Sequence, residues 1–278
     1  MGGSGLWPRA GQACSGYLLS HDDVRLLIDP GYGVLAELLR HCAASEVDAV
    51  LISHGHLDHC ADLVPLLRAR AFELADGQPA LPVVAPDGAL TALFELGGAS
   101  GAVDGWGASV PVELIPPSAA KIGFGPLTVS SAELRHHQTT YGFRITDPSG
   151  AVFVYTADSG PSPDRVDLAR DAGVLLAETT YPDGVPDADA RYLSDARQVA
   201  SLALDADVDH CVITHLHPSA DPIQALTIIR RSGLDSVEYA RPGLTREVIL
   251  RPAATGLPRR AAPKVITMTS SLPRRAAQ

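Results

Sequence analysis

Short runs of apolar residues alternate along the chain with longer amphipathic stretches. The apolar runs predict strands at Ser15–Leu19, Val24–Ile28, Ala49–Ile52, Pro82–Ala85, Val110–Ile115, Leu127–Ala132, Tyr141–Thr146, Ala151–Thr156, Val174–Ala177, Cys211–Thr214, Val237–Tyr239 and Glu247–Leu250. The amphipathic stretches predict helices at Gly33–Cys42, Asp58–Phe72, Gly88–Leu96, Pro163–Asp171, Asp195–Ala206 and Pro222–Arg231. This alternation is typical of a layered α/β fold.

Histidine and aspartate are concentrated directly after the third predicted strand. Residues 51–60 read LISHGHLDHC, and this short segment contains His54, His56, Asp58 and His59. Imidazole and carboxylate groups are good ligands for zinc-like cations, and α/β sheets present their sites at the carboxyl ends of strands. The alternative is a polar loop that contains these histidines by chance. Four potential ligands within six residues make that alternative unfavourable.

Three later segments place similar side chains at or near the ends of predicted strands. LRHHQTTYGFRI (134–145) contains His136 and His137, and VYTADSG (154–160) places Asp158 after a strand. CVITHLHP (211–218) places His215 and His217 after another strand. These segments would complete a site for two metal ions, because the first motif alone has too few ligands for two.

In this order, the HxHxDH motif followed by His, Asp and His resembles the metal motifs of the metallo-β-lactamase superfamily. The resemblance covers about residues 11–250 and is closest to the phosphodiesterase and ribonuclease Z-like branch, whose third histidine lies five residues before a Tyr/Phe-Gly pair. His136 lies five residues before Tyr141-Gly142 and His137 only four, so the spacing favours His136. The segments YGFRITDPSG and YTADSG are also similar to compact bacterial cyclic-nucleotide phosphodiesterases.

The resemblance implies a four-layer αββα sandwich with the site at one edge, and it assigns the donors to two ions. One ion would be bound by His54, His56 and His136, the other by Asp58, His59 and His215, with Asp158 bridging both. Zinc is the usual metal of the superfamily, with manganese or iron as alternatives, because nitrogen and oxygen ligands alone do not decide between them.

A mechanism follows from two such ions. They would lower the pKa of a bridging water and offset phosphoryl charge, so that a bridging hydroxide attacks in line. Asp58 would orient that water in addition to binding metal. His217, two residues after His215, is the candidate proton donor to the leaving group, and its alternative role is an ordinary hydrogen bond at the rim. Asp29, at the end of another strand, is expected to form structural hydrogen bonds rather than bind metal.

The chain departs from its apparent relatives at two positions. Ala177 stands where the tRNA-processing enzymes carry a histidine, and Tyr192 replaces a histidine of the compact relatives. Glu178 is retained and is expected to hydrogen-bond a ligand histidine. The interval from His136 to Asp158 is too short for the long tRNA-gripping arm of the processing enzymes.

The distribution of charged residues along the chain limits the class of substrate. The 278 residues include 22 Lys and Arg against 32 Asp and Glu, a formal net charge of −10. Residues 251–278 hold six cations and no acid, which leaves 16 cations against the 32 acids, and therefore −16, on residues 1–250. Because phosphate neutralisation by Lys and Arg dominates nucleic-acid affinity, so acidic a body favours a small anionic substrate over long nucleic acid.

The domain organisation follows from where the ligands lie. They come from both halves of the chain and must converge, so residues 1–250 are predicted to form one hydrolase domain. Residues 251–278, rich in Pro, Ala and Arg, are expected to form a disordered basic tail. Little sequence precedes the glycine-rich turn at residues 2–5, where the family has a leading strand. We expect its absence to leave a neighbouring strand unpaired at one edge.

Several features favour a cytoplasmic protein. No apolar run approaches the roughly 20 residues of a membrane span, the N-terminus has no signal-peptide pattern, and the scattered cysteines are expected to be reduced. A homodimer is left open. The favoured function is a dinuclear metal-dependent phosphodiesterase for a small phosphodiester such as a cyclic nucleotide. The alternatives are a hydrolase of a lactone, thioester or sulfate ester, a tRNA 3′-processing endonuclease, and a non-catalytic metal-stabilised binding protein.

Overall fold

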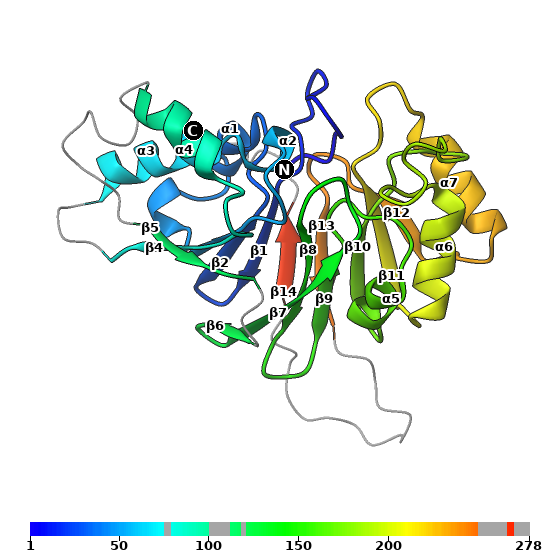
Figure 1. Cartoon of the computed structure of the whole chain (residues 1–278). Coiled ribbons are helices and arrows are strands. Elements are labelled where there is room, and N and C mark those ends of the chain that lie inside the picture. The colour runs from blue at the N-terminus through cyan, green and yellow to red at the C-terminus, as the bar shows by residue number, and fades with distance from the viewer. Residues whose placement is uncertain (75–78, 100–111, 118–120, 250–265, 270–278) are drawn as a thin grey trace, which may run out of the picture.

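A computed structural model of the chain describes residues 1–74, 79–99, 112–117, 121–249 and 266–269 (Figure 1). The described strands form two seven-stranded sheets. In spatial order, the first sheet contains β13 (Thr245–Val248), β14 (Ile266–Thr269), β1 (Tyr17–His21), β2 (Val24–Ile28), β3 (Ala49–Leu51), β4 (Leu81–Val84) and β5 (Val112–Ile115). The second contains β12 (Val237–Tyr239), β11 (His210–Thr214), β10 (Val174–Glu178), β9 (Val152–Tyr155), β8 (Thr140–Thr146), β7 (Leu127–Leu134) and β6 (Ile122–Phe124).

Helices cover the outer face of each sheet (Figure 1). The first sheet is covered by α1 (Val34–Leu38), α3 (Leu63–Glu73) and α4 (Thr91–Ala99). The second is covered by α5 (Pro163–Ala169), α6 (Ala196–Asp205) and α7 (Pro222–Arg231). Two shorter elements are the 3-10 helix η1 (Ala44–Glu46) and α2 (Leu57–Cys60). None of the helices in the described ranges combines the length and apolar character needed to cross a bilayer.

Side-chain alternation along the strands separates the core between the sheets from the two outer layers. Tyr17 and Leu19 of β1 share the central apolar cluster with Phe153 and Tyr155 of β9. Leu18, between them in sequence, belongs to the cluster formed with the helices over the first sheet. Because successive side chains of a strand point to opposite faces, each sheet is buried on both sides. The order of layers is αββα, which confirms the predicted fold class.

The strand directions bring several loops to one edge of the sandwich. β2 and β3 are parallel, as are β9, β10 and β11. β7 is antiparallel to β8, which is antiparallel to β9, so β7 and β9 end on the same side. Side chains from the loops after β3, β7, β9 and β11 meet there, within 4 Å of Asp158. The fold therefore positions chain segments far apart in sequence around one point.

The predicted helix Asp58–Phe72 is two helices in the structure. α2 ends at Cys60 and α3 begins at Leu63, with Asp62 as its N-cap residue. The backbone N–H of Asp62 donates to the carbonyl of Pro30, and its carboxylate accepts from the N–H of Leu35. These bonds to another segment replace the helical ones, and Pro65 lies in the first turn of α3, where proline is tolerated. The break orients α2 independently of the longer helix.

The structure also differs from the basic tail expected over residues 251–278. Ile266–Thr269 forms β14, which pairs with β1 on one side and β13 on the other. Strand β1 is thereby paired at both edges, contrary to the expected loss of pairing. The sequence ITMT is β-branched at three of four positions, but the Pro-, Ala- and Arg-rich surroundings conceal this signal. The rest of residues 251–278 lies outside the described residues.

Thr267→Pro is expected to lower the melting temperature by several degrees. β14 is paired on both sides, so each inner residue donates its N–H to one neighbour, and proline has no N–H to donate. An unsatisfied acceptor in a sheet costs about 1–3 kcal/mol, and in a chain of this size 1 kcal/mol shifts the melting temperature by roughly 2–4 °C. Thr267→Val keeps the N–H and the β-branch and is the control. Equal melting temperatures for the two variants would show that β14 does not form.

Candidate metal centre

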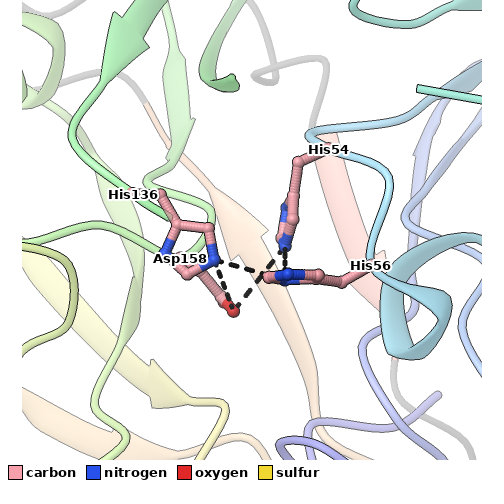
Figure 2. A group of neighbouring side chains, drawn as sticks. All are labelled: His54, His56, His136 and Asp158. Atoms are coloured by element: carbon pink, nitrogen blue, oxygen red, sulfur yellow. Dashed lines mark hydrogen bonds and ion pairs between the residues drawn. The ribbon is translucent and has the colours of Figure 1, made fainter. Parts of the chain in front are cut away.

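Seven side chains gather where the loops after β3, β7, β9 and β11 meet, and they form two groups. The donor atoms of the first group all lie within 4.8 Å of one another, and its members are His54, His56, His136 and Asp158 (Figure 2). The second group meets the same limit and consists of Asp58, His59 and His215. The structure thus brings together every residue that the sequence predicts as a metal ligand, and it groups Asp158, the predicted bridge, with His54, His56 and His136.

In the first group, three imidazoles face one carboxylate. His56 Nδ1 lies 2.9 Å from His54 Nε2 and 3.3 Å from His136 Nε2. Asp158 Oδ2 lies 3.9 Å from each of His54 Nε2 and His136 Nε2 (Figure 2). Distances of this size between donor atoms match the spacing of ligands around a single ion with bonds of about 2.0–2.2 Å.

The second group shares the carboxylate of Asp158 with the first. Asp58 Oδ2 lies 3.2 Å from His215 Nε2 and 3.6 Å from His59 Nε2. Asp158 Oδ2 lies 3.2 Å from the same nitrogen of His215 and 3.3 Å from that of His59. One oxygen atom therefore has four imidazole nitrogens within 3.9 Å, two from each group.

The buried carboxylate of Asp29 fixes the orientation of two of these rings. It accepts hydrogen bonds from the Ser53 backbone N–H and hydroxyl, both at 2.7 Å, from Tyr155 Oη at 2.8 Å and from His59 Nδ1 at 2.9 Å. Because the Ser53 hydroxyl donates to Asp29, His54 Nδ1 donates to Ser53 Oγ at 2.9 Å. Both histidines thus carry a proton on Nδ1 and direct Nε2 into the site. This agrees with the structural role expected for Asp29.

His136 and His215 also direct Nδ1 away from the site. Residues on later loops form hydrogen bonds with these two atoms. His136 Nδ1 donates to the backbone carbonyl of Tyr192 at 3.0 Å. His215 Nδ1 pairs with Thr180 Oγ1 at 3.1 Å. Glu178, which was expected to bond a ligand histidine directly, instead accepts from the Thr180 backbone N–H at 2.7 Å. Its effect on the site is therefore indirect, because it holds the turn that carries Thr180.

Three residues in or beside the donor groups have a strained backbone. Asp29, Ala157 and His215 have φ angles of 48°, 51° and 55°, in the left-handed region that non-glycine residues rarely adopt. Each such residue costs on the order of 1–3 kcal/mol and persists only where the surrounding structure determines it. Gly5 packs so closely that a Cβ there would lie 3.0 Å from the His215 ring. The surrounding structure therefore constrains His215 on several sides.

Burial and charge set the pKa values in the cluster. Burial holds the pKa of three imidazoles below the ordinary value, those of His54, His56 and His136. These rings are neutral near pH 7 and have lone pairs available. Burial also acts to lower the pKa of His59, but the nearby carboxylates, Asp158 first, raise it well above its ordinary value. The carboxylates thus favour positive charge beside His59, as a cation site requires.

The donor chemistry of both groups fits a divalent cation. Within the described residues, Asp158 Oδ1 and His59 Nε2 are buried and make no hydrogen bond. Leaving buried polar atoms without partners is costly, and a bound ion would satisfy them. With nitrogen and oxygen donors alone, the groups suit zinc, manganese or iron equally.

The predicted proton donor, His217, belongs to neither donor group and lies at their rim. Ser219 donates its backbone N–H to His217 Nδ1 at 3.2 Å, so the neutral ring carries its proton on Nε2. The half-exposed Trp7 meets the His217 ring edge-on, with centroids 5.4 Å apart. In the same loop, the Leu6 backbone N–H donates to Asp58 Oδ2 at 2.8 Å. This loop therefore joins His217 to the second donor group.

Some supporting residues could not be found from the sequence. Thr180, Ser53 and Tyr155 are common residue types with no motif of their own, and only the fold places them against Asp29 or a histidine. The contact of Leu6 with Asp58 uses a backbone N–H, which any residue except proline provides. A weak signal did exist for Ser53, since it directly precedes the motif histidine His54.

Comparison with known proteins gives consistent matches. A family model described as "Beta-lactamase superfamily domain" matches residues 24–216. The probable metallo-hydrolase YhfI of Bacillus subtilis (strain 168) is 31% identical over 214 residues, covering 76% of this chain and 83% of that protein. The crystal structure of YhfI, a metallo-β-lactamase fold protein, superposes with a TM-score of 0.75 at 28% identity and covers 87% of this chain and 95% of YhfI. A ribonuclease Z from Kineococcus radiotolerans is 25% identical over 311 residues, covering 95% of this chain and 96% of that protein.

His136→Ala is expected to reduce the bound metal, whereas His137→Ala leaves it nearly unchanged. His136 Nε2 points into the first donor group, while His137 is 43% exposed and its Nε2 lies 3.2 Å from Asp189 Oδ1. The measurement is metal content per chain by inductively coupled plasma mass spectrometry after dialysis. Metal loss in both variants, or in His137→Ala alone, would contradict the placement of His136 as the ligand.

Proposed function

Because this chain belongs to the metallo-β-lactamase superfamily of metal-dependent hydrolases, we propose that it is a dinuclear phosphodiesterase acting on a small phosphodiester such as a cyclic nucleotide. The observation that carries the proposal is the single oxygen Asp158 Oδ2 with two imidazole nitrogens from each donor group within 3.9 Å. A carboxylate shared in this way is suited to bridge two cations.

The donor groups, Asp58, His217 and the Asp29 network would have separate roles in the reaction. Divalent ions held by the two groups would supply the Lewis acidity that activates water near neutral pH and offsets phosphoryl charge. Asp58, whose Oδ2 is held by the Leu6 N–H, would orient the attacking water as well as bind metal. His217 would give the proton on its Nε2 to the leaving oxygen. The Asp29 network keeps the ligand rings in one orientation, so little reorganisation accompanies the reaction.

The short β8–β9 connection supports a small substrate. β8 ends at Thr146 and β9 begins at Val152, and the turn between them is closed by Asp147 Oδ1, which accepts from the Ala151 N–H at 2.9 Å. No arm is inserted at this point of the described chain. The charge of −16 on residues 1–250 acts in the same direction, because it would repel a long polyanion.

The proposal also includes the identity of the metal and the cellular compartment. Zinc is the metal we propose, with manganese or iron as alternatives, because the donor set accepts all three. We also propose that the protein works in the cytoplasm. All four cysteines are buried free thiols, which agrees with a reducing compartment.

The test is a substrate screen with the purified, metal-loaded protein. The substrates are bis(p-nitrophenyl) phosphate, cyclic nucleotides, lactones and precursor tRNA. We expect turnover of the phosphodiesters, and we expect Asp158→Ala to lose turnover and bound metal together. Asp164→Ala removes an exposed carboxylate in the first turn of α5 and should change neither. Hydrolysis of lactones alone, or full activity in Asp158→Ala, would overturn the proposal.

His217→Asn is expected to slow diesters with poor leaving groups far more than bis(p-nitrophenyl) phosphate. General acid catalysis contributes typically 10²–10⁴-fold, and a p-nitrophenolate leaving group needs little of it. The measurement is the slope of log kcat against the pKa of the leaving alcohol or phenol, which should become steeper in the variant. An unchanged slope would show that His217 does not donate the proton.

A further inference from the structure

A cavity of about 500 Å³ opens beside the first donor group. Its lining includes Arg135, His136, His137, Gln138, Arg191 and Tyr192. His136 belongs both to this cavity and to the first donor group, so the cavity adjoins the proposed metal centre at His136. A substrate whose scissile group lay at the donor groups would have its remaining part within reach of this cavity.

The cavity contains cationic groups on an otherwise acidic body. Arg135 and Arg191 are exposed, and within the described chain neither guanidinium forms an ion pair. Glu133 supplies the one carboxylate in the lining. The nearby Asp189 accepts from Tyr181 Oη at 2.6 Å and pairs with His137 at 3.2 Å. Among the described residues, the two arginines therefore line the cavity without a carboxylate within ion-pair distance.

The aromatic side of the cavity is fixed to the metal centre. The rings of His137 and Tyr192 pack together, with centroids 4.3 Å apart and planes 38° apart. Asp189 Oδ1 lies 3.2 Å from His137 Nε2. The backbone carbonyl of Tyr192 accepts a hydrogen bond from His136 Nδ1 at 3.0 Å. A ligand that contacts Tyr192 thus contacts the residue that orients a predicted metal ligand.

We propose that this cavity binds a second anionic group of the substrate, a phosphate distal to the scissile phosphodiester. The inference rests on the proposed function and names its substrate class: a small phosphodiester that also carries a terminal phosphate monoester. Guanidinium groups match phosphate oxygens with paired, charge-assisted hydrogen bonds. Both arginines line the same cavity, and a cavity of this size accommodates a group of nucleotide dimensions.

The direct test measures binding without turnover. The probes are adenosine 3′,5′-bisphosphate and adenosine 5′-monophosphate, titrated calorimetrically into the metal-loaded full chain. We expect the bisphosphate to bind at least about 10-fold more tightly, because a hydrogen bond to a charged group contributes roughly that factor. Arg135→Gln and Arg191→Gln should each reduce the preference by roughly 3-fold, half of it on a logarithmic scale, and the double variant should abolish it.

The control variant is Arg170→Gln, which removes one exposed cation at the end of α5, outside the cavity. It should leave the preference for the bisphosphate unchanged. An equal loss of the preference in Arg170→Gln would show that overall charge causes it and would overturn the proposed phosphate subsite. A double variant that keeps the preference, or a wild-type protein without one, would also overturn it. Melting temperatures of all variants exclude loss of folding as the cause.

A kinetic comparison separates this inference from the proposed function. The quantity is the ratio of kcat/KM for a 5′-phosphorylated dinucleotide to kcat/KM for the same dinucleotide without the terminal phosphate. It should fall in both arginine variants through a higher KM for the phosphorylated form. If no diester is hydrolysed but the binding preference depends on the arginines, the proposed function fails and the anion site stands. If both dinucleotides are hydrolysed with a ratio that the arginines do not change, the subsite fails alone.

Discussion

The constraint on which the rest of this structure depends is the convergence of four imidazole nitrogens on one oxygen of Asp158. Holding these donors together in a buried place is unfavourable unless each polar atom finds a partner. The inward-facing atoms have the bound cations as their expected partners. The outward-facing nitrogens are paired with Ser53, Asp29, Tyr192 and Thr180, residues on four separate loops. The αββα sandwich is what brings those loops to one edge.

The sequence was most informative where the chemistry is local. The quartet His54 to His59 occupies one short loop and helix, so its residue spacing alone indicates a common site. His136 was distinguished from His137 by its spacing to Tyr141-Gly142, and the structure places only His136 among the donors. The layered α/β class followed from alternating strands and helices, since their apolar patterns differ in period, whereas the four-layer αββα order was implied by the family resemblance. The prediction that the donors bind two ions is supported by their grouping and awaits a measurement of metal.

The sequence was least informative where the partner lies far away in the chain. Glu178 acts on Thr180 rather than on a histidine, and this depends on a turn geometry that residue types do not encode. β14 consists of four residues inside a Pro- and Arg-rich stretch, and its position depends on pairing with β1, nearly the whole chain away. At the split between α2 and α3, Asp62 donates its backbone N–H to Pro30 and accepts at its carboxylate from the N–H of Leu35. For β14 and for Asp62, hydrogen bonds to a distant segment override the local pattern.

The central claim is that the two donor groups hold two metal ions that share Asp158. The most direct measurement is anomalous diffraction at the zinc absorption edge from crystals of the zinc-loaded protein. The account predicts two anomalous peaks about 3.5–4 Å apart. Each should lie within bonding distance of Asp158, one beside His54 and His136 and the other beside His59 and His215. A single peak, or two peaks of which neither contacts Asp158, would contradict it.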